Sequence, residues 1–63
     1  MVKEYDKIRL VSGEIGRILE IISPSVYLAE IVKQKGGIDT TEISGADIKS
    51  VFIEYEEPYQ AAM

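Results

Sequence analysis

The chain contains no cysteine, no histidine and no tryptophan among its 63 residues. The lack of cysteine excludes disulfide bonds, and without cysteine and histidine the usual zinc sites cannot form. The same lack removes thiol nucleophiles and imidazole acid–base catalysis. Glycine, proline or charged residues interrupt every apolar segment, so no run approaches the roughly 18 residues of a membrane span. We therefore expect no enzyme activity, no cofactor, no metal and no membrane insertion.

Positive charge is also scarce, because seven lysine and arginine residues stand against eleven acids and give a net charge of -4. A negative mean field disfavours nucleic acid, whose phosphates bind through counterion release to basic side chains. The residues after Met1 lack the apolar segment and small-residue cleavage site of a secretory signal. We therefore expect a cytoplasmic protein for which nucleic acid is a disfavoured partner.

Apolar residues make up 46% of the chain, enough for one small domain over residues 1–63. Turn-forming residues divide the chain at intervals of about ten, a spacing typical of all-β barrels and sandwiches. We predict five strands, over residues 5–11, 17–22, 26–32, 37–43 and 51–55. Ser44 and Asp47 can cap a single helical turn over 44–48, before the last strand. Residues 56–63 are predicted to form a frayed tail outside a core of about 5–55.

Alternation of apolar and polar residues assigns the faces of these strands. It predicts an inward-facing set that comprises Ile8, Leu10, Tyr27, Ala29 and Ile31. The hydroxyl of Tyr27 is expected at the rim of the core. Ile18 and Phe52 are also expected in the core, where truncation to alanine costs about 2–5 kcal/mol.

Residues 14–35 also fit a helical pattern. Spacing typical of one helix face is found at Ile15, Ile18, Leu19 and Ile22. Ser23 and Pro24 could begin a second helix that ends at Gly36. The β-branched content and Gly16 favour strands, but periodicity alone leaves the helical alternative open.

Three segments resemble small barrels of the SH3-like class. The sequences DKIRL over 6–10 and GEIGRILEI over 13–21 are similar to the opening of KOW-type domains and of short uncharacterised bacterial SH3-like proteins. YLAEI over 27–31 resembles a later strand of those proteins, and residues 43–51 resemble their ending. The resemblance covers about residues 5–55 and implies a five-stranded SH3-like barrel.

KOW-type domains serve ribosomal and transcription proteins that bind RNA or protein, so the resemblance implies one of these two partner classes. RNA-binding KOW domains are usually basic around the first loop, whereas here that loop carries Glu14 and follows two acids. This difference favours protein over RNA. The bases that would contact nucleic acid in the alternative are Arg17, Lys33 and Lys35.

Tyrosine supplies four of the five aromatic residues, and tyrosine is enriched at protein interfaces because it combines a rigid apolar ring with a polar tip. Three tyrosines lie near the chain ends, at Tyr5, Tyr55 and Tyr59. If the first and last strands are adjacent, these residues form one aromatic patch edged by Glu54 and Glu56. We predict that this acid-rimmed patch binds a basic or mixed protein surface; the alternative is that each tyrosine only covers a barrel end.

The sequence is best interpreted as a non-catalytic protein-interaction or regulatory module of the bacterial cytoplasm. We expect it to bind an unidentified protein partner and to be a monomer or weak homodimer. Two alternatives stay open: a KOW-like RNA- or ribosome-associated accessory, and a small acidic inhibitor of phage or antitoxin type. Salt-dependent RNA binding would favour the first alternative.

Overall fold

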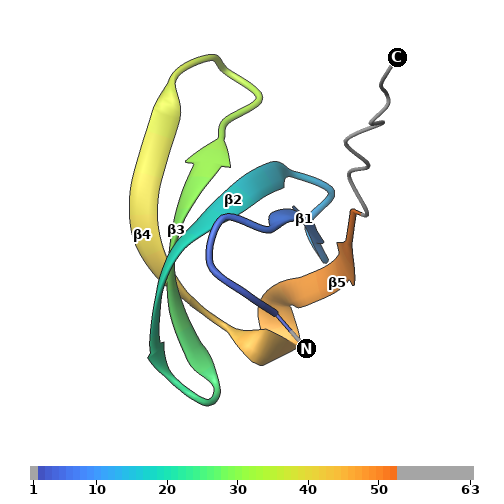
Figure 1. The fold of residues 1–63 in the computed structure, drawn as a ribbon. Coiled ribbons are helices and arrows are strands. Elements are labelled where there is room, and N and C mark those ends of the chain that lie inside the picture. Colours follow the sequence, from blue (N-terminus) through green and yellow to red (C-terminus); the bar gives the residue numbers. More distant parts are fainter. Residues whose placement is uncertain (1, 53–63) are drawn as a thin grey trace, which may run out of the picture.

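Five antiparallel strands and one 3₁₀ turn make up residues 2–52, the part of the chain that this computed structural model describes (Figure 1). The elements are β1 (Lys7–Leu10), β2 (Ile15–Ser23), β3 (Val26–Val32), β4 (Ile38–Ser44), the turn η1 (Gly45–Asp47) and β5 (Ile48–Val51). The predicted all-β class is confirmed. The helical alternative for residues 14–35 is wrong, because they form the β2–β3 hairpin and the turn that follows it.

The strands form one sheet in the order β4-β3-β2-β1-β5. The first and last strands are therefore adjacent, with Ile8 opposite Val51, which is the condition on which the predicted tyrosine patch depends. The sheet curls until η1 meets the β2–β3 turn, where the Gly45 N–H donates to the Ser25 carbonyl at 2.9 Å. No ladder joins β4 to β5 within residues 2–52, so this is an open, curled sheet compatible with a small β-barrel.

Element boundaries differ from the sequence-based expectation at the first and last strands. β1 begins at Lys7 rather than at residue 5, because Tyr5 has a φ of 70°, which interrupts the extended chain. The helical turn ends at Asp47, whose carboxylate accepts a 3.0 Å bond from the Ser44 N–H. β5 then occupies residues 48–51, so the prediction of a last strand over 51–55 is wrong in its start; residues 53–55 lie outside the described part.

The core lies on the concave side of the sheet and confirms the predicted alternation. Its buried residues are Ile8, Leu10, Ile18, Tyr27, Ala29, Ile31 and Ile43. The Tyr27 hydroxyl donates to the Pro24 carbonyl at 3.1 Å, so the polar end of this side chain is satisfied at the rim. Val2 and Ile48 are partly buried against this cluster.

Phe52 was expected in the core, and that expectation is wrong. The side chain is half-buried, and its ring centroid lies 5.3 Å from the Lys7 Nζ and 5.4 Å from the Arg9 Cζ. The cause is a β-bulge: Ile48 pairs with Leu10 but Ser50 pairs with Arg9, which leaves Lys49 as an extra residue. One extra residue reverses the alternation, so Phe52 points to the outer face.

Gly16 allows β2 and β3 to approach closely. A Cβ at this position would lie 2.6 Å from the Glu30 carbonyl oxygen and 2.6 Å from the Ile31 Cδ1. A backbone oxygen cannot move aside as the end of a flexible side chain can. Only glycine therefore fits at this point of the hairpin.

Candidate functional site

Two adjacent rows of side chains cross the outer face of the sheet, opposite the core. The first row runs from β1 to β4 through Arg9, Ile15, Val32 and Ile38. The second row consists of Lys7, Arg17, Glu30 and Thr40. Both rows face outward because the strand residues between them on β1, β2 and β3 are buried. Antiparallel register thus brings apolar and cationic residues from four strands together.

Six residues of these rows, together with Gly16, line a shallow groove of about 140 Å³, and Arg9 lies beside it at the β1 end. Its lining residues are Lys7, Ile15, Gly16, Arg17, Glu30, Val32 and Ile38. Val32 is 52% exposed and Ile38 is 64% exposed, so the apolar end of the groove is open to solvent. Small-molecule sites usually enclose about 300–1,000 Å³, whereas this groove has room for one or two side chains of a bound peptide.

The opposite end of the groove is cationic. Lys7 and Arg9 both lie over the Phe52 ring, whose negative face attracts them and holds them on the outer face. The Arg17 guanidinium donates to the Tyr5 carbonyl at 2.7 Å, which ties the chain before β1 to this end. One acid, Glu30, lies among these bases. The arrangement suits a ligand that carries a carboxylate close to a large apolar group.

Tyr5 is the one member of the predicted tyrosine patch that falls within the described residues. Its side chain is 64% exposed, and its backbone N–H donates to the Ile18 carbonyl at 2.7 Å. Through Arg17 it borders the cationic end of the groove. The other predicted members, Tyr55, Tyr59, Glu54 and Glu56, lie outside the described residues. A continuous patch of all five residues stays a prediction.

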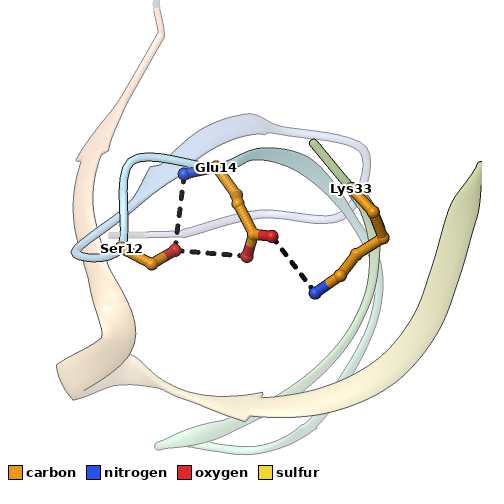
Figure 2. Close-up of polar contacts among 3 residues, drawn as sticks. All are labelled: Ser12, Glu14 and Lys33. Carbon is orange, nitrogen blue, oxygen red and sulfur yellow. Dashed lines mark hydrogen bonds and ion pairs between the residues drawn. The ribbon is translucent and has the colours of Figure 1, made fainter. Parts of the chain in front are cut away.

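The bases predicted for nucleic-acid contact have different surroundings. Arg17 lines the groove, and Lys35 is exposed in the turn between β3 and β4. Figure 2 shows that Lys33 instead points to Glu14, with 3.1 Å between Nζ and Oε2, while the Ser12 hydroxyl donates to the other Glu14 oxygen at 3.2 Å. Glu14 thus supplies Lys33 with a carboxylate partner in place of a phosphate.

Val32 and Ile38, the exposed apolar members of the groove, were not predicted as site residues from the sequence. Val32 and Ile38 flank the turn over 33–37, so hairpin pairing alone predicts that they lie opposite each other. A second signal is the outward face of β3, which carries Val26, Leu28 and Val32 where a fully solvated face would be polar. The contribution of Phe52 could not be found in this way, because it depends on the bulge in β5.

The described residues contain neither a cluster of metal-ligating side chains nor a helix suited to span a membrane. Within residues 2–52, no group of three or more acidic, cysteine or histidine side chains is arranged to hold a metal ion. The same residues include no helix of the length and apolarity needed to cross a membrane. Among the described residues, the groove is the main candidate site.

Comparisons with known proteins give no match: no protein-family model matches the chain, and neither the curated proteins nor the solved structures include a significant relative. The likeness to KOW-type and SH3-like proteins therefore rests on the sequence motifs alone. The fold itself is a five-stranded antiparallel sheet of the kind found in small β-barrels. Function must be argued from the groove.

Proposed function

We propose that this protein is a non-catalytic protein-interaction module of the SH3-like barrel type, which acts in the cytoplasm. Its outer-face groove binds an extended, acidic segment of a partner protein. The observation that carries the proposal is one groove that has an exposed apolar pair, Val32 and Ile38, at one end and Lys7 at the other, where Lys7 and Arg9 lie over the Phe52 ring. Exposed apolar surface rimmed by charge is characteristic of interaction sites.

The two ends of the groove define the partner's chemistry. A carboxylate can form charge-assisted hydrogen bonds with Lys7 or Arg9. A leucine or tyrosine side chain a few residues away can cover Val32 and Ile38. The Tyr5 carbonyl accepts a hydrogen bond from Arg17, so the backbone of Tyr5 lies beside the cationic side of the groove. The width of four strands, about 14 Å at ordinary strand spacing, corresponds to about four extended residues.

Nucleic acid is the competing ligand class at the same bases. A phosphate chain would be attracted to Lys7 and Arg9. It would be repelled by Glu30 in the groove and by the overall net charge of -4. It would also leave the apolar pair uncovered. An acidic peptide makes use of both ends and therefore fits better.

The test uses the full chain and two synthetic probes of ten residues. One probe is rich in glutamate with a central tyrosine, and the other has lysine in place of each glutamate. We expect the acidic probe alone to bind, with shifts of the Val32 and Ile38 amide signals in a ¹H–¹⁵N NMR titration. An oligouridylate of similar length should not compete at physiological salt.

Matched variants test whether the acidic probe binds in the groove. Val32→Ser with Ile38→Ser should weaken the acidic probe about tenfold, as should Lys7→Glu with Arg9→Glu. The controls are Val11→Ser and Lys49→Glu, which change exposed residues that do not line the groove. Equal binding of both probes would contradict the proposal. Tighter, steeply salt-dependent binding of the oligonucleotide would replace it with the RNA-binding alternative.

A further inference from the structure

The acids of the chain are unevenly divided between the described residues and the eleven that follow. All seven bases lie within residues 2–52 together with eight of the eleven acids, so this part has a net charge of -1. The C-terminal segment, residues 53–63, contains Glu54, Glu56 and Glu57 and no base. Three of the four net negative charges therefore belong to the C-terminal segment.

This segment has the chemistry that the groove selects. It combines its three glutamates with two large amphipathic side chains, Tyr55 and Tyr59. It also begins beside the groove, because Phe52 is the residue before it. The Phe52 ring lies under Lys7 and Arg9. The backbone N–H of Phe52 donates to the Lys7 carbonyl at 2.8 Å. The segment is thus tethered at the cationic end of the groove.

The length of the segment decides which tyrosine can reach the apolar pair. β5 and β4 are separated by four strand spacings, about 19 Å along the sheet. Tyr55 is three residues beyond Phe52 and reaches at most about 10 Å, whereas Tyr59 is seven residues beyond and reaches about 23 Å. Ile38 lies on β4, the farther of the two strands, so Tyr59 has the reach to cover both Ile38 and Val32, with the glutamates spaced along the cationic stretch before it.

We propose that the C-terminal segment of this chain folds back into its own groove. Tyr59 lies on Val32 and Ile38, and Glu54, Glu56 and Glu57 lie along Lys7 and Arg9. This inference rests on the proposed function of the groove and adds its regulation: a partner's acidic segment must displace the chain's own. Tethering favours the internal ligand, since it raises its effective concentration to the millimolar range.

The chain's lack of cysteine allows a direct test. A nitroxide on Ala61→Cys, two residues past Tyr59, places a single spin label in the full chain. We expect it to broaden the amide signals of Val32 and Ile38 at least about threefold more than that of Ser25, which lies in the turn at the other end of the β2–β3 hairpin (Figure 1). Tyr59→Ala should abolish the difference, and Tyr55→Ala should leave most of it.

A mixed sample separates the internal contact from a contact between copies. When spin-labelled chain without ¹⁵N is mixed with ¹⁵N chain without the label, the proposal predicts no selective broadening. Selective broadening in the mixed sample alone would show that a second copy supplies the segment, which would overturn the proposal. Uniform broadening in the doubly labelled chain would overturn it as well.

A binding measurement connects this contact with regulation. Glu56→Gln with Glu57→Gln should raise the affinity for the acidic probe at least about threefold, because the internal competitor is weakened. The matched control is Glu20→Gln with Glu42→Gln, which makes the same change in net charge at residues opposite Leu28, outside the groove. If the probe binds the groove but neither the broadening nor the affinity depends on the segment, the fold-back is wrong and the proposed function stands. If the probe does not bind while the segment broadens Val32 and Ile38, the groove serves only the internal contact.

Discussion

Val32 and Ile38 lie directly opposite each other across the β3–β4 hairpin, and both side chains are more than half exposed. The turn between them is closed by backbone bonds: the Lys33 N–H donates to the Gly37 carbonyl at 3.0 Å, and the Gly36 N–H donates to the Lys33 carbonyl at 2.9 Å. Backbone register, rather than burial, therefore holds the apolar end of the groove.

Truncation of this pair should separate binding from stability. Because both side chains are exposed, Val32→Ala should change the free energy of unfolding by less than about 1 kcal/mol. The same variant should weaken the acidic probe by several-fold, since the lost methyl groups belong to the binding surface. Urea denaturation and the NMR titration measure the two effects on one sample. A large loss of stability with unchanged binding would contradict the assignment of this face.

Core truncation should have the opposite profile. Ile18 is 0% exposed and lies in the buried cluster, so Ile18→Ala should lower the free energy of unfolding by about 2–5 kcal/mol. Val11→Ala, at a residue that is 66% exposed, is the control and should stay within about 0.5 kcal/mol. The measurement is the shift of the urea midpoint at constant m-value. Equal effects of the two variants would show that the core is misassigned.

Gly16→Ala should destabilise the hairpin although it adds a single methyl group. The new Cβ would meet the Glu30 carbonyl oxygen at 2.6 Å, and relief requires β2 and β3 to separate. We expect a loss of about 1–3 kcal/mol, the usual cost of overpacking. Ser50→Ala, an exposed position on β5, is the control in thermal unfolding. An unchanged melting temperature for Gly16→Ala would show that the two strands are farther apart than described.

Phe52 should contribute to the stability of the fold through its ring, and its contribution should be smaller than that of a core residue. Each cation over the ring is expected to supply about 0.5–1 kcal/mol at this partly exposed position. A double-mutant cycle that combines Phe52→Leu with Arg9→Met should therefore give a coupling energy in that range. The matched cycle with Lys49→Met in place of Arg9→Met should give none. A coupling near zero in both cycles would show that the ring contact adds nothing to stability.

The ion pair of Glu14 and Lys33 should be weak. Lys33 is substantially exposed, and exposed pairs are worth about 0–1 kcal/mol. Lys33→Met should change stability by no more than this amount, and the difference from the unmodified chain should shrink in 1 M salt. Urea denaturation at low and high salt provides the measurement. A larger effect that salt does not reduce would indicate packing of the lysine stem instead.

The sequence was sufficient to predict the strands that alternate regularly. In β1, apolar and charged residues alternate, so the burial of Ile8 and Leu10 could be predicted from spacing alone. In β3 the burial alternates without interruption, but the sequence is apolar at every position except Glu30. The β2–β3 hairpin could not be separated from two helices by periodicity, because isoleucine and leucine occupy positions that suit both structures. The structure shows strands because the backbones of β2 and β3 pair across the turn. The spacing of apolar residues gives no information about this pairing.

The groove shows the limit of reasoning from pattern. Its cationic members were visible as outward-facing bases of the first strand, but the place of Phe52 beside them depends on the bulge at Lys49. A bulge leaves no reliable mark in an alternating pattern of four residues. Cross-strand pairing then joins residues that are far apart in sequence, such as Arg9 and Ile15 with Val32, into one surface.

Among residues 2–52, the open seam between β4 and β5 leaves two strand edges whose backbone groups can accept another strand, and such edges promote aggregation. β4 carries Asp39 and Glu42 on its exposed surface, so two copies that approach edge to edge through β4 bring like charges together. On the other side, the bulge at Lys49 breaks the regular spacing that an added strand needs. The same irregularity that turns Phe52 outward thus also protects the sheet from growing at its β5 edge.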